Sequence, residues 1–208
     1  ATGIMPRTAE LLDEVSCDTL RRQPTHALPA DCGAALILET DGSEEQALDE
    51  LATLAAACEE HGATSVLVAQ TPKDRERVWA PRRDLSVALG DRRSFKVSED
   101  IAVPRGRLSD LVQALRKVAS STPFEVATYG HAGDGNLHVN ILFDDEHQRP
   151  DVEALQDEVF RTALDLGGTI TGEHGVGLAK KHALKWEASP ARLATETAIK
   201  NAMDPKDL

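Results

Sequence analysis

The sequence predicts an α+β fold, in which a ferredoxin-like, antiparallel sheet carries helices packed on one face. Two observations lead to this prediction. Strand-like apolar segments alternate with longer segments of helical periodicity, and two strand-like segments follow each other directly around a glycine-rich turn. This combination favours a mostly antiparallel sheet. The chain has neither a G-x-G-x-x-G on a strand-to-helix turn nor a Walker sequence, so it carries no dinucleotide or nucleotide fingerprint.

Length and composition limit the classes of function. The 208 residues, of which 41% are hydrophobic, can bury a substantial core, and we expect residues 1–208 to form one domain. A net charge of −12 argues against nucleic acid as a partner. No run approaches the roughly 18 apolar residues of a transmembrane helix, and no signal-peptide pattern opens the chain. Three scattered cysteines suit a reducing compartment, so we expect a cytoplasmic protein.

Local signals define the elements in the first half of the chain. Ser43 favours a helix start and Gly62 a helix end, whereas Pro81 is expected to disturb the helix that contains it. The expected elements are a helix over 8–22, a connector over 23–32, a strand over 34–39, a helix over 43–61, a strand over 64–69 and a helix over 71–89.

The second half follows the same rules. Apolar residues at three-four spacing predict an amphipathic helix over 107–120. A strand over 93–103 is expected to bend or break at Ser98-Glu99-Asp100. The remaining expected elements are strands over 124–129 and 137–143 and helices over 151–166, 176–185 and 190–203.

The turn between the last two strands carries the first functional motif. Residues 130–140 read Gly-His-Ala-Gly-Asp-Gly-Asn-Leu-His-Val-Asn, and the central Asp134-Gly135 pair favours a two-residue type I′ turn. Such a turn places His131 directly opposite His138 on one face, with Cβ atoms roughly 4.5–5.5 Å apart. At that distance, two imidazoles can close on one metal ion.

A second motif, Gly-Glu-His-Gly-Val-Gly at 172–177, sets Glu173 and His174 among glycines, which allow close approach of a ligand. His131, His138 and Glu173 together provide three ligands with positions left open, as in a catalytic zinc site. Zinc suits these donors, and manganese, iron and cobalt are alternatives.

The two motifs, at this separation, resemble the C-terminal substrate domain of the FAD-linked oxidases. This family contains glycolate oxidases, D-lactate dehydrogenases and D-2-hydroxyglutarate dehydrogenases. Similar segments extend along the chain, at 78–82, 95–104 and 199–205. The position after Arg82, usually acidic in the family, is Arg83, and the family's terminal Asn-Pro-Gly-Lys is absent. The family's N-terminal FAD-binding domain is also absent, so we expect this chain to be a fragment that is inactive without it.

The resemblance implies oxidation of a D-2-hydroxy acid, such as glycolate or D-lactate, to the 2-oxo acid. A divalent metal on the three ligands would chelate the substrate's hydroxyl and carboxylate and lower the pKa of the alcohol. His174 is then the candidate general base, and the hydride passes to FAD held mainly by the other domain. Further partners expected are an electron acceptor, which would allow peripheral attachment to a membrane, and a second copy of the chain.

Four polar residues are candidates for substrate binding. Arg82 is expected to clamp the substrate carboxylate because a guanidinium group matches it bidentately. Lys96 is a second cation, Ser86 follows Arg82 by one helical turn, and Asn140 shares the face of His138. The sequence identifies no residue that contacts FAD.

Each assignment has a plainer structural reading. Glu173 is also explained as a carboxylate at a helix start, Arg82 as a solvated helix residue, and Lys96 as a lysine that protects a strand edge. Two other functions are considered. A zinc hydrolase would use the metal to generate hydroxide and would act on esters or amides without flavin, whereas a non-catalytic metal-binding module would have a closed four-ligand shell.

Overall fold

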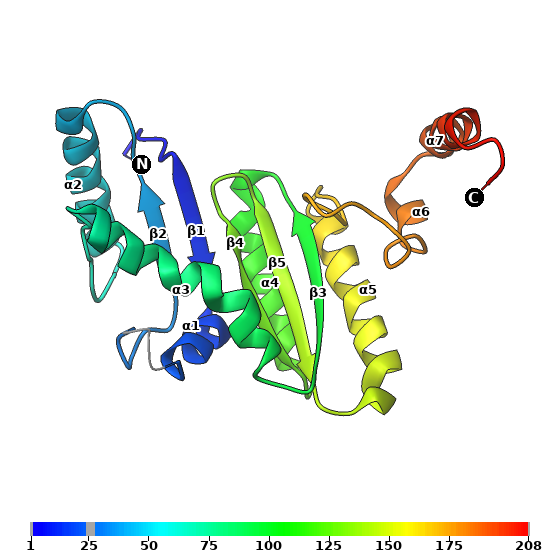
Figure 1. Ribbon diagram of the computed structural model, residues 1–208, viewed down its shortest axis with the longest axis horizontal. Coiled ribbons are helices and arrows are strands. Elements are labelled where there is room, and N and C mark those ends of the chain that lie inside the picture. Colours follow the sequence, from blue (N-terminus) through cyan, green and yellow to red (C-terminus); the bar gives the residue numbers. More distant parts are fainter. Residues whose placement is uncertain (1, 24–27, 208) are drawn as a thin grey trace.

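The computed structural model describes residues 2–23 and 28–207, so the predicted connector over 23–32 falls partly outside the described residues. One five-stranded sheet runs through the middle of the molecule, in the order β2-β1-β4-β5-β3, and every neighbouring pair is antiparallel (Figure 1). The predicted α+β class is thereby confirmed. The strands are β1 (Thr8–Leu12), β2 (Ala35–Glu39), β3 (Phe95–Ala102), β4 (Glu125–His131) and β5 (Asn136–Phe143).

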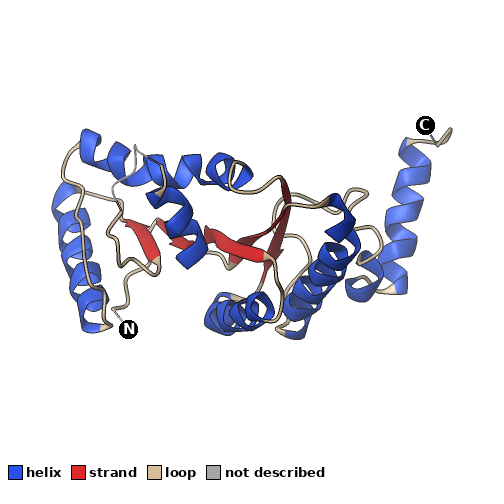
Figure 2. Ribbon diagram, turned by 90° about the horizontal axis from the view of Figure 1, so that it is seen from below, coloured by secondary structure: helices blue, strands red, loops and turns tan. Residues whose placement is uncertain are grey.

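Helices lie on both sides of this sheet (Figure 2). The α-helices are α1 (Glu14–Arg21), α2 (Glu44–Glu60), α3 (Pro72–Gly90), α4 (Leu108–Ser120), α5 (Arg149–Asp165), α6 (Leu184–Glu187) and α7 (Pro190–Met203). Two short 3-10 helices, η1 (Arg105–Arg107) and η2 (Glu146–Gln148), precede α4 and α5.

The two faces of the sheet bury separate cores. On one face, α4 and α5 cover the alternate strand residues Val126, Val139 and Ile141. On the other, α1 and α3 cover Ala127 and Leu142. The predicted layer of helices on one face corresponds to α4 and α5. The prediction missed a second layer, α1 and α3, on the other face. The second layer covers the apolar residues of β4 and β5 on that face, Ala127, Tyr129 and Leu142.

The predicted helix over 8–22 is instead a strand followed by a helix. Residues 8–12 form β1, which pairs with both β2 and β4. Asp13 ends the strand and caps α1, because its carboxylate accepts hydrogen bonds from the backbone N–H of Ser16 at 2.9 Å and Thr128 at 2.6 Å. The helix therefore begins after Asp13, and residues 8–12 form a strand because they pair with β2 and β4.

The structure also changes several other elements that were predicted from local sequence. Residues 64–69 form no strand, and they have no pairing partner in the described part of the chain. Helix α3 continues through Pro81, and β3 runs unbroken across 98–100. Of the helix expected over 176–185, only the beginning of α6 is helical. The strand over 34–39 and the helices over 43–61, 107–120, 151–166 and 190–203 are confirmed within two residues.

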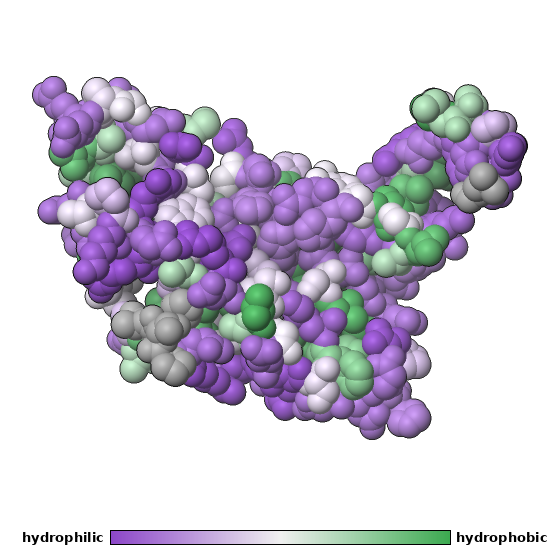
Figure 3. All heavy atoms as spheres, viewed as in Figure 1, coloured by the Kyte–Doolittle hydropathy of each residue, from purple (hydrophilic) through white to green (hydrophobic). Residues whose placement is uncertain are grey.

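The C-terminal segment α6–α7 projects from the body of the molecule in both views (Figures 1 and 2). The surface seen in Figure 3 is mostly hydrophilic, with small separate apolar patches, as expected for a net charge of −12. None of the helices in residues 2–23 and 28–207 combines the length and apolar character needed to span a bilayer.

Candidate metal and substrate site

A row of polar side chains lies on the sheet face that α3 partly covers. The register pairs His138 of β5 with Tyr129 on one side and Asp100 on the other, and it pairs Asn140 with Ser98. Since alternate residues of a strand share a face, these side chains all lie on the same side of the sheet. The sheet therefore presents polar groups of three strands beside α3.

The hairpin between β4 and β5 differs from the predicted two-residue turn. His131 pairs with Asn136, not with His138, and residues 132–135 form a four-residue loop. Two tertiary contacts fix this loop: the Gly133 N–H donates to Ala9 of β1, and the Val103 N–H donates to the carbonyl of Gly135. A β-carbon at Gly135 would lie 2.1 Å from the Val103 carbonyl oxygen, so this contact requires glycine.

The corrected register still brings the two histidines together. A shift of two residues preserves the face on which a side chain lies, so His131 and His138 become diagonal neighbours. Their ring centroids are 5.4 Å apart. Burial lowers the pKa of His138, and the nearby His131 and Arg82 lower it further. These effects favour the neutral imidazole, which is the form that binds a metal ion.

Glu173 completes a group of three donors. Its Oε1 lies 3.7 Å from Nε2 of His131 and 3.5 Å from Nε2 of His138. All three donor atoms lie within 4.8 Å of one another. Ligands at the usual zinc distances stand about 3.4 Å apart in a tetrahedral site. The spacing of the donor atoms therefore fits a single small divalent ion. The three residues are the ones that the sequence predicted as its ligands.

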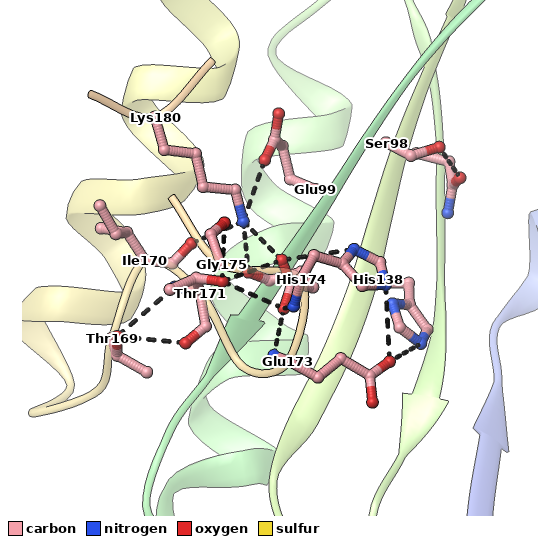
Figure 4. A network of polar contacts seen from close by, with 12 residues as sticks. Ser98, Glu99, His138, Thr169, Ile170, Thr171, Glu173, His174, Gly175 and Lys180 are labelled. Atoms are coloured by element: carbon pink, nitrogen blue, oxygen red, sulfur yellow. Dashed lines mark hydrogen bonds and ion pairs between the residues drawn. The ribbon is translucent and has the colours of Figure 1, made fainter. Parts of the chain in front are cut away.

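Asp100 holds the loop that carries Glu173. The Asp100 carboxylate accepts hydrogen bonds from the backbone N–H of Glu173 at 2.5 Å and of His174 at 3.0 Å, and it is bonded to the ammonium group of Lys180. Burial raises the pKa of Asp100, but these hydrogen bonds outweigh burial and hold the pKa at about 2. Lys180 also donates to Ile170 and pairs with Glu99, as Figure 4 shows.

Gly172 allows this loop to pack closely against the hairpin. A β-carbon at residue 172 would lie 2.3 Å from Oδ1 of Asn136. This oxygen is buried and has no hydrogen-bond partner among the described residues. Gly172 thus allows the loop to pack on the sheet. The sequence suggested a different role for the glycines, the close approach of a ligand.

The candidate base, His174, lies at the open side of the donor group. Its ring stacks on His138 with centroids 5.4 Å apart, and its side chain is 55% exposed (Figure 4). Nδ1 of His174 is 3.5 Å from Oδ1 of Asp100, and Nε2 is 3.6 Å from Oε1 of Glu173. The imidazole therefore borders the predicted metal position and remains accessible to a small molecule.

Arg82 is brought from α3 to the same group. Its Nε donates to Oε2 of Glu10 at 2.6 Å, and its guanidinium carbon lies 4.7 Å from the centre of the Tyr129 ring. Asn140 is also on this face, but its side chain is buried, and its amide bonds Ser98 Oγ at 2.6 Å and the Ala127 carbonyl at 3.5 Å.

Ser86 and Lys96 form a pair of their own. The ammonium group of Lys96 donates to the Ser86 carbonyl at 2.6 Å and lies 3.2 Å from its hydroxyl. Lys96 pairs with Leu142, four residues beyond His138 on β5, which corresponds to about 13 Å along the strand. The structure therefore brings these two predicted substrate residues to each other, at the far end of the polar row from the donor group.

Three residues of the site have no functional assignment from the sequence. Glu10 falls within a predicted helix, because residues 8–12 by themselves do not reveal the pairing of β1 with β2 and β4. Asp100 is singled out only as a possible break in β3. Lys180 lies 80 residues from Asp100, and no local pattern links the two.

Comparisons with known proteins identify a family for this chain. A family model described as "FAD linked oxidases, C-terminal domain" matches residues 1–208. The chain is 34% identical over 212 residues to "Glycolate oxidase subunit GlcD" of Bacillus subtilis (strain 168), covering 100% of this chain and 45% of that protein. It is 30% identical over 212 residues to "D-lactate dehydrogenase" of Anaerostipes hadrus, covering 97% of this chain and 45% of that protein.

A third similar protein is "D-2-hydroxyglutarate dehydrogenase" of Stutzerimonas stutzeri (strain A1501). It is 29% identical over 185 residues, which cover 86% of this chain and 39% of that protein. The chain thus spans less than half the length of the curated relatives it matches.

Proposed function

The chain belongs to the family of FAD linked oxidase C-terminal domains, and from this premise we propose that it is the substrate- and metal-binding domain of an FAD-dependent enzyme. The proposed reaction oxidises a D-2-hydroxy acid, such as glycolate or D-lactate, to the 2-oxo acid. The observation that carries this proposal is the convergence of His131, His138 and Glu173, with donor atoms 3.5–3.7 Å from the Glu173 oxygen, beside Arg82 and His174.

His131, His138 and Glu173 would hold one divalent ion, and zinc suits two imidazoles and a carboxylate. A bound ion supplies polarisation of the substrate hydroxyl, and FAD supplies the hydride acceptor. FAD would be bound mainly by an N-terminal FAD-binding domain outside this sequence. The separation of the three donors in the chain supports a site that forms only on folding.

The side chains around the donors have distinct proposed roles. Arg82 binds the substrate carboxylate, because a guanidinium group presents paired N–H donors to two carboxylate oxygens. His174 accepts the hydroxyl proton, and its exposure and position beside the donors support this role. Asn140, Ser86 and Lys96 extend the polar row away from Arg82, and Ser86 and Lys96 would meet only the more remote part of a larger hydroxy acid.

The first test is the metal content of the purified full-length protein and of its His138→Ala and His131→Ala variants. We expect about one equivalent of a divalent metal in the wild type, bound at the proposed three-ligand site, and its loss in both variants. His61→Ala is the matched control, since His61 is an exposed histidine at the end of α2. Metal retained in both site variants contradicts the proposed ligand set.

A further inference from the structure

A buried carboxylate connects the proposed metal and substrate residues. Glu10 lies on β1 directly opposite His131 of β4, and its side chain is 5% exposed. Its Oε1 lies 2.5 Å from Nδ1 of His131, and its Oε2 lies 2.6 Å from Nε of Arg82. Each oxygen of one carboxylate therefore contacts a different functional side chain.

The contact with His131 determines which ring nitrogen can bind a metal ion. A carboxylate oxygen only accepts hydrogen bonds, so Nδ1 of His131 is the donor in this pair. In a neutral imidazole the lone pair then lies on Nε2. Nε2 is the nitrogen that lies 3.7 Å from Oε1 of Glu173, so Glu10 selects the tautomer that the donor group requires.

The contact with Arg82 determines which part of the guanidinium group remains for a ligand. Nε is held by Glu10, and the plane of the group lies over Tyr129. In residues 2–23 and 28–207, Nη1 and Nη2 of Arg82 have no hydrogen-bond acceptor. These two nitrogens are the donors left for an incoming carboxylate, and Glu10 fixes their orientation.

We propose that Glu10 is a positioning residue that couples metal binding to substrate binding. One carboxylate sets the tautomer of His131 and the orientation of Arg82, so the ion and the cationic anchor for the substrate are held at a fixed spacing. This inference rests on the proposed function, because it assigns Glu10 through the residues proposed to bind metal and substrate.

The test is Glu10→Gln in the full-length protein. The substitution keeps the shape, but it replaces one of the two acceptor oxygens by an NH2 donor, so one of the two contacts, to His131 or to Arg82, loses its acceptor. We expect the affinity for Zn2+, measured by competition with a chromogenic chelator, to fall by about 10- to 100-fold, the usual effect of removing a carboxylate behind a metal-bound histidine. We also expect KM for glycolate or D-lactate to rise.

Glu39→Gln is the matched control. Glu39, on the neighbouring strand β2, also bonds α3, through Nε of Arg75 at 2.6 Å and Nε1 of Trp79 at 2.8 Å. It contacts neither His131 nor Arg82 in the described structure. If Glu10 merely tied α3 to the sheet, the two variants would behave alike. We expect Glu39→Gln to keep the Zn2+ affinity and KM of the wild type.

A second measurement does not depend on the folding of a variant. Nitrogen-15 chemical shifts of the His131 ring in the metal-free wild-type protein should show the proton on Nδ1; a proton on Nε2 would overturn the inference. Wild-type Zn2+ affinity and KM in Glu10→Gln would also overturn it and would leave the proposed function intact. A wild-type protein that binds no divalent metal would overturn the proposed metal site and the coupling together.

Discussion

Two buried carboxylates, Glu10 and Asp100, hold opposite sides of the same donor group in different ways. Glu10 bonds side chains: an imidazole and a guanidinium group. Asp100 bonds the backbone N–H groups of Glu173 and His174 and the ammonium group of Lys180. Backbone anchoring fixes where a loop lies whatever its side chains are, whereas side-chain contacts also fix tautomer and orientation. In this site, the position of the loop that carries Glu173 and the tautomer of His131 therefore depend on two different carboxylates.

The largest expected effect concerns His174, whose backbone N–H is bonded to Asp100. His174→Ala should lower kcat by about 10²- to 10⁴-fold, the range typical for loss of a general base, without loss of metal. Steady-state turnover and metal content of the same preparation test this expectation. Loss of the metal together with activity would make His174 a fourth ligand, as in the closed shell of a non-catalytic module, and would remove its role as the base.

Asp100→Ala tests the anchoring side directly. Removing one partner of a buried ion pair costs about 3–5 kcal/mol, and we expect about 3 kcal/mol, the low end of that range, because Glu99 still pairs with Lys180. Urea unfolding measures the loss, and limited proteolysis should cut within 171–177. Asp157→Ala, which breaks an exposed pair with His182, is the control. A change below about 1 kcal/mol, the value of an exposed pair, would show that Asp100 does not hold the loop.

Arg82→Lys tests the Glu10 side. Lysine keeps the charge but loses the bond from Nε to Glu10 and the paired donors of Arg82. We expect KM for glycolate or D-lactate to rise by about 10-fold, the equivalent of one hydrogen bond to a charged group, with a much smaller change in kcat. The neighbouring Arg83 is exposed and bonded to Glu76, so Arg83→Lys should change neither constant. An unchanged KM in Arg82→Lys would remove Arg82 from the substrate site.

The smallest expected effect is on the pH dependence of stability, and it involves two carboxylates far from the donor group, Asp18 and Glu125. Hydrogen bonds from Arg92 lower the pKa of Asp18 and of Glu125 from their ordinary values of 3.8 and 4.5. Because the folded pKa values are lowered, this stabilisation is present above those ordinary values and is lost as the pH falls below them. Arg92→Met should therefore flatten the acid limb of stability against pH in urea titrations. A limb that is as steep as in the wild type would contradict the role of Arg92.

The residues of this site differ in whether the sequence alone predicts them. His131, His138 and Glu173 are predictable as a group because their motifs are local and because strand parity survives a two-residue error in register. Glu10 and Asp100 are not, because each acts across the sheet on residues distant in sequence. The same limit explains the fold: the sequence predicts a helix where β1 lies, since the pairing of β1 with β2 and β4 is not visible in residues 8–12.

The four-residue loop between β4 and β5 has a consequence for the order of folding. His131 and His138 are close in sequence, so the hairpin can bring them together within about 1–10 μs. Glu10 reaches His131 across 121 residues of chain, and its pairing awaits closure of a far larger loop. In a stopped-flow refolding experiment, we therefore expect tight metal capture to appear only in the last kinetic phase, after the hairpin has formed.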